Sequence, residues 1–347
     1  MPDKLRTVLV GCGSISRTWL NAVRDMDDVE VVGLVDINEE AAKQRQQEYS
    51  LPSAVVDTDL RRVLKHTNPD IVFDCSTPSA HAEVTITALE HGCHVLGEKP
   101  MADSMENAWK MINAAQDAGK VYAVMQNRRY DPRIRSLRRF LASGRIGDLT
   151  TLHSDFFIGA HFGGYRDRME HVLLLDMAIH TFDQARLISG ANPKAVYCKE
   201  WNPKGSWYDH DASAVCIFEM TDGIVYTYRG SWCAEGLSTT WESSWRCLCE
   251  RGSVIWDGAD GFQAQGVAET GGFLSKLEYI DVPVLADEKS GGHAGLIKDF
   301  VQCIKVGSTP ETICTDNIHS LAMVFAAIES AETGGRVELS SLGKSGS

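Results

Sequence analysis

Three side chains in the sequence have types and spacing that suit proton and hydride chemistry: Lys99, Asp176 and His180. Oxidising a secondary alcohol requires a base for the hydroxyl proton and a group that stabilises developing negative charge while hydride leaves the same carbon. His180 is the natural base. Asp176 lies four residues earlier on the same face of a helical segment, where it could orient the imidazole or bind a substrate hydroxyl. Lys99 could stabilise the alkoxide.

A glycine-rich turn near the amino terminus could hold a dinucleotide. Residues 11–16 read Gly-Cys-Gly-Ser-Ile-Ser, after a β-branched run and at the start of a helical stretch. The first glycine permits the turn, the second admits a pyrophosphate, and Ser16 keeps the helix close to the strand. Asp36, about 20 residues further on, can accept hydrogen bonds from ribose hydroxyls and would repel a 2′-phosphate. No arginine follows it directly, so these residues predict NAD as the cofactor.

Six short apolar runs in the first part of the chain alternate with helical stretches, which is typical of a parallel sheet with right-handed crossovers. The predicted strands are residues 7–10, 29–36, 54–56, 71–75, 94–97 and 121–125. Lys99 follows the fifth of them, at the carboxyl end where such sheets bind ligands. The sequence therefore predicts an α/β Rossmann domain with a doubly wound parallel sheet over residues 1–127.

The pattern changes after residue 129. A helix at 132–142 precedes alternating strands at 213–220, 223–231, 242–250 and 253–256, and further helices are expected at 172–189, 294–305 and 315–333. This predicts an α+β domain over residues 128–347, with an open, mainly antiparallel sheet covered by helices on one face. The other face could join copies into a dimer or tetramer through nearby aromatic residues, or these could fill the core. They are Trp201, Trp207, Tyr226, Tyr228, Trp232, Trp241 and Trp245.

Charge and composition exclude several classes of partner. Lys and Arg number 34 against 47 Asp and Glu, and the formal net charge of −13 would repel nucleic acid and anionic membranes. The amino terminus lacks the apolar core of a signal peptide, and the apolar runs are too short for a membrane helix. The ten cysteines are scattered without a CxxC pair. We therefore expect reduced thiols and a cytoplasmic protein.

Several ordered motifs resemble one family. Residues 91–102, HGCHVLGEKPMA, resemble the EKP signature of the Gfo/Idh/MocA oxidoreductases. STPSAH at 76–81, QNRRYDP at 126–132, LLLDMAIHTFDQAR at 173–186 and the segment 299–339 are similar to successive family motifs. The resemblance covers nearly the whole chain.

The resemblance implies an NAD-dependent dehydrogenase or reductase acting on a CH–OH group of a sugar, glycoside or cyclitol. It implies Lys99 and His180 as the proton-handling pair, with Asp176 beside them. Pro100 could follow a cis peptide that aims Lys99. Together with the glycine-rich turn, the implied cofactor contacts are Gly11, Gly13, Ser14, Ile15, Asp36, Ile37, Ser76, Thr77, His81, Glu98, Lys99 and Arg129. Arg129 and Asp183 are also implied as substrate contacts.

The chain departs from the family before the Asp176 helix. Family members often have glycines there, whereas residues 166–171 read Arg-Asp-Arg-Met-Glu-His. Arg166, Arg168 and His171 could line a polar substrate pocket and accept an anionic group, or they could form an exposed charged loop. Asp176 and His180 with His171 or His293 match no established zinc spacing, so no metal is expected.

Two other functions compete with this interpretation. The same fold hosts glycosidases that hold NAD tightly and oxidise the sugar only transiently. A dinucleotide-sensing regulator could instead keep the Rossmann domain and lack catalysis. The presence of Lys99, Asp176 and His180 together argues against a regulator.

Overall fold

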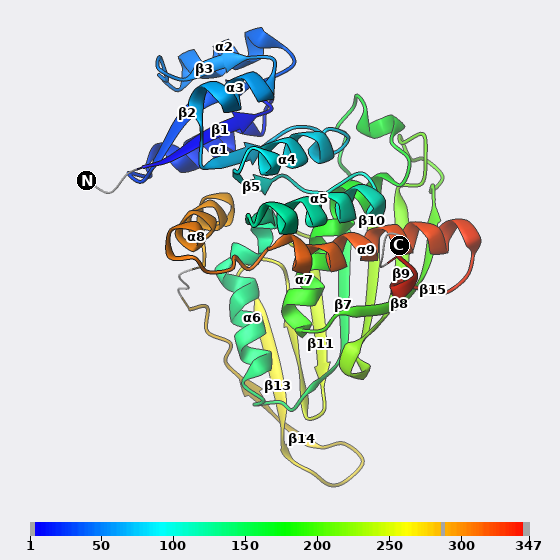
Figure 1. Ribbon diagram of the computed structural model, residues 1–347. Helices are drawn as coiled ribbons and strands as arrows, with labels where there is room; N and C mark the ends of the chain where they lie inside the picture. Colours follow the sequence, from blue (N-terminus) through cyan, green and yellow to red (C-terminus); the bar gives the residue numbers. More distant parts are fainter. Residues whose placement is uncertain (1–3, 286–288, 343–347) are drawn as a thin grey trace. The chain divides into compact units, whose positions relative to one another are not determined.

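The computed structural model describes residues 4–285 and 289–342, which divide into two compact units (Figure 1). Of these residues, unit 1 contains 4–127 and 291–318, and unit 2 contains the rest. The first stretch of unit 1 ends at residue 127, and residues 291–318, from the part of the chain predicted as a second domain over 128–347, also belong to unit 1. Helix α8 (Gly292–Val306) packs against α1 (Ser16–Arg24), and Lys305 pairs with Asp28 at 2.8 Å.

Unit 1 is built on a six-stranded parallel sheet in the order β3-β2-β1-β4-β5-β6. The strands are β1 (Leu5–Val10), β2 (Val29–Val35), β3 (Val55–Asp57), β4 (Ile71–Asp74), β5 (His94–Gly97) and β6 (Tyr122–Val124). The crossover helices are α1, α2 (Glu39–Glu48), α3 (Leu60–Thr67), α4 (His81–Glu90) and α5 (Met105–Ala118). This order confirms the predicted Rossmann sheet, whose ligands bind where the order reverses, between β1 and β4.

Polar side chains fix where several of these helices begin. Asn38 accepts a hydrogen bond from the Glu40 amide at the start of α2, and Ser104 accepts one from the Asn107 amide at the start of α5. Helix α5 ends at Gly119, which adopts the left-handed conformation that favours glycine. Local capping therefore fixes where the loops that carry Asp36 and Lys99 end and the next helices begin.

Unit 2 contains a nine-stranded sheet in the order β14-β13-β12-β11-β7-β10-β9-β8-β15. Its strands are β7 (Leu149–Phe157), β8 (Pro193–Trp201), β9 (Ser213–Met220), β10 (Val225–Ser231), β11 (Ser244–Cys249), β12 (Gly252–Trp256), β13 (Phe262–Glu269), β14 (Lys276–Ile280) and β15 (Val337–Glu338). Neighbours pair antiparallel except β7 and β10, which are parallel. The predicted, mainly antiparallel sheet is confirmed. Five of its strands were not identified from the sequence: β7, β8, β13, β14 and β15.

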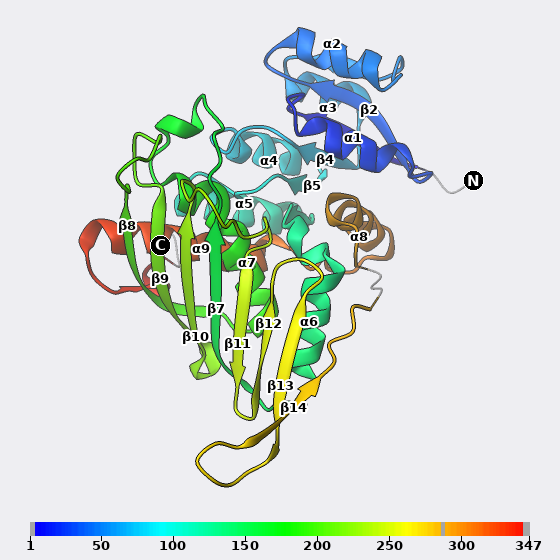
Figure 2. The same cartoon turned by 180° about the vertical axis from the view of Figure 1, so that it is seen from behind.

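Helices α6 (Pro132–Ala142) and α7 (Ile179–Ser189) lie on one face of this sheet, and Figure 2 shows the strands from the opposite side. Phe182 of α7 packs edge-on against Phe218 and Tyr228, with ring centres 4.8 and 5.2 Å apart. Four of the seven aromatic residues proposed for the interface are core residues, at most 1% exposed: Tyr226, Tyr228, Trp232 and Trp245. Trp201 and Trp241 remain exposed, at 40% and 49%.

The last helix, α9 (Cys314–Thr333), begins in unit 1 and continues into unit 2. Among the described residues, no helix is both long and apolar enough to cross a membrane.

Candidate active site

The glycine-rich turn joins β1 to α1 and leaves room for a ligand on one side. Gly11 has a φ of +90°, and a Cβ there would lie 2.5 Å from the carbonyl of Cys75, so only glycine fits against the end of β4. A Cβ added at Gly13 would meet no atom within 4 Å. Gly13 is therefore not required by internal packing, and the space beside it suits the close approach of a pyrophosphate at the amino terminus of α1.

Asp36 links this turn to the start of α2. Its Oδ2 accepts a hydrogen bond from the Cys12 amide at 2.7 Å, and its Oδ1 accepts one from the Asn38 amide at 2.8 Å. The remaining lone pairs can accept ribose hydroxyls. Ile37 is 97% exposed, which leaves its side chain available to an adenine ring. Burial, reinforced by Asp36, raises the pKa of Cys12 to about 12, so this thiol stays protonated. These groups fit NAD.

The loop after β4 is ordered by a buried carboxylate. Asp74, fully buried, lies 2.9 Å from His81 Nδ1 and accepts a hydrogen bond from the Ser76 hydroxyl at 2.5 Å. Burial alone would lower the pKa of His81, but the charge and hydrogen bond of Asp74 raise it by more. His81 is only 1% exposed. Its imidazole therefore shapes the loop that carries Ser76 and Thr77, and a direct contact of His81 with the cofactor stays a prediction.

Lys99 follows β5 in a peptide that is cis to Pro100, as the sequence suggested. The preceding Glu98 is buried, and its carboxylate accepts hydrogen bonds from Trp19 Nε1 at 2.7 Å and from the Lys99 amide at 3.2 Å. His293 Nε2 lies 3.9 Å from Glu98. Burial lowers the pKa of His293, and Lys99 adds to this, whereas Glu98 opposes it. His293 is therefore a neutral neighbour of the EKP motif, a place the sequence did not indicate.

Asp176 lies in a π-helical turn, Leu173–Ala178, which continues directly into α7. The whole predicted helical segment is present, but the hydrogen-bond register of its first part differs from that of an α-helix. His180, buried, is in the first turn of α7. Such single π turns occur often at functional sites, because the wider turn re-aims the side chains that it carries.

Arg166 binds Asp176 within unit 2. Its Nε and Nη2 lie 2.9 and 3.3 Å from the two carboxylate oxygens. The guanidinium also lies over the rings of Phe162 and Tyr165, with distances of 4.9 and 5.0 Å to the ring centres. Burial alone would lower the pKa of Arg166. The hydrogen bond to Asp176 and the charge of Asp176 outweigh burial, so the pKa of Arg166 is raised overall. Arg166 was expected to accept an anionic group, and in the structure it binds the carboxylate of Asp176 in the same chain.

Arg129 and Asp183 form a buried ion pair. Two guanidinium nitrogens lie 2.6 Å from the two carboxylate oxygens, and the Ser320 hydroxyl donates to Asp183 Oδ1 at 2.7 Å. Asp183 is 1% exposed and Arg129 5%. The structure brings these two predicted residues together. Both side chains are buried in unit 2 and bind each other. Their contact with substrate or cofactor therefore stays a prediction.

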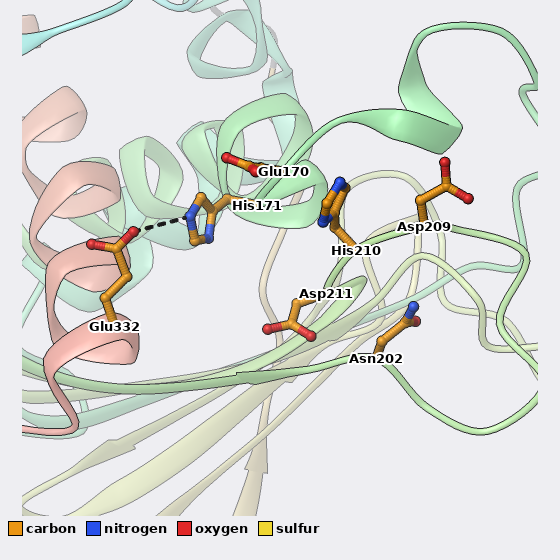
Figure 3. Close-up of a pocket in the computed structure, with 7 residues that line it drawn as sticks. All are labelled: Glu170, His171, Asn202, Asp209, His210, Asp211 and Glu332. Carbon is orange, nitrogen blue, oxygen red and sulfur yellow. Dashed lines mark ion pairs between the residues drawn. The ribbon is translucent and has the colours of Figure 1, made fainter.

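His171 lines a pocket of about 360 Å³ (Figure 3). Its Nδ1 lies 2.6 Å from Glu200, and its Nε2 lies 3.5 Å from Glu332. The other lining residues are mostly acidic: Glu170, Asn202, Asp209, His210, Asp211 and Glu332. Arg166, Asp176 and His180 are not among them. The polar pocket predicted over residues 166–171 is therefore divided, with Arg166 at Asp176, His171 in the acidic pocket and Arg168 exposed.

Within the described ranges, no group of three or more His, Cys, Asp or Glu side chains is arranged to hold a metal ion. The polar side chains described above make these contacts within their own unit: Glu98 with Trp19 in unit 1, and Arg166 with Asp176, Arg129 with Asp183 and His171 with Glu200 in unit 2.

Comparisons with known proteins agree with this arrangement. The model for the "Oxidoreductase family, NAD-binding Rossmann fold" matches residues 5–126, and the "GFO/IDH/MocA C-terminal domain" model matches residues 134–255. A D-apiose dehydrogenase from Paraburkholderia graminis is 26% identical over 98% of this chain and 91% of its own length. A D-glucoside 3-dehydrogenase from Escherichia coli is 30% identical over 54% of each chain.

The fold is also that of a solved oxidoreductase from Agrobacterium radiobacter in complex with NAD+, L-tartaric acid and magnesium. The TM-score is 0.85 at 19% identity, and the match covers 98% of this chain and 99% of the other. Two consecutive family models match the chain, and a D-apiose dehydrogenase aligns with nearly its whole length. The Rossmann sheet and its glycine-rich turn agree with these matches. The chain belongs to the Gfo/Idh/MocA family of NAD-binding oxidoreductases.

Proposed function

We propose that the protein transfers hydride between NAD and a secondary hydroxyl or keto carbon of a neutral sugar, glycoside or cyclitol. The observation that carries the proposal is the position of Asp176 and His180 within unit 2, where the π turn continues into α7. The relatives named as dehydrogenases of D-apiose and of D-glucosides support this substrate class.

Each residue of the proposed site has a distinct task. The glycine-rich turn and Asp36 would hold NAD, which would supply the hydride acceptor. His180 removes the hydroxyl proton, and Lys99 stabilises the negative charge that develops on the oxygen. Asp176 binds a neighbouring hydroxyl or orients His180, and Arg166 holds its carboxylate in place. A buried histidine and a positioned ammonium suffice for the proton transfer, so the proposed chemistry needs no metal ion.

The Arg166–Asp176 pair favours a neutral substrate over an anionic one. An anionic group would have to compete with a carboxylate that already binds Arg166 through two nitrogens. A neutral polyol can instead donate hydroxyls to Asp176 without breaking that pair. The exposed rings of Phe162 and Tyr165, which lie against the Arg166 guanidinium, offer a surface for the nonpolar face of a sugar ring.

We also propose a homo-oligomer that uses the sheet face opposite α6 and α7. Tyr197, Trp201 and Ile217 on β8 and β9 are 47%, 40% and 45% exposed, which is a large apolar exposure for neighbouring strands. All ten cysteines are free thiols, as expected in a reducing compartment, and we propose that the protein acts in the cytoplasm. Light scattering of the purified protein tests the oligomer, which a monomer would contradict.

The experiment that tests the function is a panel of neutral sugars, glycosides and cyclitols incubated with NAD, with NADH absorbance as the readout. At least one compound should produce NADH, and Lys99→Ala should abolish the signal. Lys110→Ala is the matched control, because Lys110 is an exposed lysine of α5 that pairs with Glu106. If NADH binds tightly and no compound reacts, the proposal fails. Sugar release without accumulated NADH would indicate a glycosidase.

A further inference from the structure

Helix α2 contains a buried arginine that the sequence analysis did not single out. Arg45 is only 4% exposed, although its helix consists mainly of polar residues. Its Nε donates to the Ser16 hydroxyl at 2.9 Å, and its Nη2 donates to the carbonyl oxygen of Gly13 at 3.1 Å. Ser16 in turn donates to the same Gly13 oxygen at 2.6 Å. Two donors thus hold one carbonyl of the glycine-rich turn.

The geometry of the peptide bond gives this contact a consequence for the cofactor. In a trans peptide, the carbonyl of Gly13 and the amide N–H of Ser14 lie in one plane and point in opposite directions. Because Arg45 and Ser16 hold the oxygen on one side, the Ser14 N–H is directed to the other side. Backbone N–H groups at this turn are the donors that a pyrophosphate needs. A Cβ at Gly13 would meet no atom within 4 Å, so the space beside the turn is open.

The charge of Arg45 is already matched inside unit 1, which argues against a direct role in binding phosphate. Its Nη1 pairs with one oxygen of Glu48, whose other oxygen lies 2.8 Å from Arg17 Nε. Ser16 is fully buried beneath the turn, so the guanidinium contacts the turn from the protein side. Arg45 therefore acts on the turn through hydrogen bonds to its backbone and to Ser16.

We propose that Arg45 is a positioning residue for NAD. It fixes the Gly13–Ser14 peptide in the orientation that binds the pyrophosphate, so that the turn needs no reorganisation when the cofactor binds. Preorganisation of this kind increases the affinity for NAD, because the entropy cost of ordering the turn arises when the protein folds and not when the cofactor binds. The inference rests on the NAD-dependent function proposed above, but its test measures cofactor binding directly and needs no substrate.

The test is a fluorescence titration of the full-length protein with NADH. In Arg45→Met, which keeps most of the side-chain volume, the Kd for NADH should rise roughly tenfold, as expected for the loss of charge-assisted hydrogen bonds. Arg45→Lys should recover part of the affinity, since an ammonium can reach one of the acceptors. Arg17→Met is the matched control, because the Arg17 side chain is half exposed and binds the same Glu48, whereas only its backbone contacts the turn. Its Kd should match that of the wild type.

Thermal unfolding separates positioning from a merely structural role. A structural role would lower the Tm of Arg45→Met and leave the Kd of the folded fraction unchanged, and this result would overturn the inference. An equal loss of affinity in Arg17→Met would also overturn it. If Arg45→Met does not fold, Ser16→Ala provides the test, and wild-type affinity in that variant would contradict the inference. Failure of the wild type to bind NADH would instead contradict the proposed function.

With an active substrate in hand, steady-state kinetics give a second readout. Arg45→Met should raise the KM for NAD by a factor similar to the rise in Kd and leave kcat within about twofold, because the interaction is equally present before and during hydride transfer. A fall in kcat at unchanged KM would contradict positioning of the cofactor.

Discussion

The Arg166 guanidinium binds the Asp176 carboxylate through two nitrogens, and the two residues are ten positions apart in the sequence. The pair lies at the start of the π turn that leads to His180. Because both carboxylate oxygens are engaged, Arg166 determines the direction in which Asp176 presents its remaining lone pairs to a substrate.

Replacing Arg166 by methionine should therefore lower kcat/KM for the polyol by about 10- to 100-fold, as expected when a substrate-binding group loses its orientation. The Kd for NADH should stay unchanged, because Arg166 is not among the residues proposed to contact the cofactor. Arg168→Met serves as the control, since Arg168 is an exposed neighbour with the same charge. Equal activity of the wild type and Arg166→Met would contradict this role.

Asp36 should set the preference for NAD over NADP. Asp36→Asn keeps an oxygen that can accept from the Cys12 amide and removes the charge that repels a 2′-phosphate. The ratio of kcat/KM for NAD to that for NADP should fall about tenfold or more. Asp57→Asn removes a carboxylate from the end of the neighbouring strand β3 and should leave the ratio unaltered. An unchanged ratio in Asp36→Asn would show that discrimination resides elsewhere.

The buried Arg129–Asp183 pair should contribute mainly to stability. Asp183→Asn leaves the Arg129 charge without its carboxylate, at a cost of about 3–5 kcal/mol. Calorimetry should show a Tm lower by roughly 6–15 °C. The double replacement Arg129→Met with Asp183→Leu should recover part of that loss, because no buried charge remains. An unchanged Tm combined with lost activity would favour the predicted substrate contact.

The His171–Glu200 pair predicts a pH dependence of stability. The hydrogen bond that His171 donates to Glu200 is the main cause that raises the pKa of His171, and burial raises the pKa of Glu200. The stability contributed by His171 is therefore complete below its unfolded-state pKa, near 6.5, and is lost as pH rises through its higher folded-state pKa. At acidic pH, protonation of Glu200 also removes the pair.

The measurement is the Tm of wild type and His171→Gln over a range from about pH 6 to pH 9. The Tm difference should be largest at the acidic end and should shrink as pH rises. His161→Gln is the control, because His161 pairs with Glu235 where both side chains are exposed. A difference that grows with pH would contradict the assignment.

Much of the fold could be predicted from sequence, because the buried parallel strands of unit 1 are continuous apolar runs. Strand β14 was missed because it is a short edge strand of five residues, four of them exposed, so its alternation of polar and apolar residues extends over too few positions. Strand β7 was missed because Ser154, which faces the core, bonds Tyr226 and breaks the apolar pattern. Residues 291–318 return to unit 1 through contacts distant in sequence, which composition does not reveal.

The sequence predicted which residues belong to the candidate site, but it did not predict which side chains they bind. The EKP motif and the spacing of Asp176 and His180 depend on local order, which sequence shows directly. The π turn and the pairing of Arg166 with Asp176 depend on the conformation of the preceding loop. Arg45 was missed because its helix has no apolar face, so its burial depends on Ser16 and Glu48.

The proposed reaction is oxidation of a secondary hydroxyl by hydride transfer to NAD, with His180 as the base. The most direct measurement uses an active polyol that carries deuterium on the reacting carbon, followed by mass spectrometry of both products. One deuterium should appear on the reduced nicotinamide for each keto product formed, and the rate should be strongly reduced in His180→Asn. Keto product without labelled NADH, or an undiminished rate in His180→Asn, would contradict it.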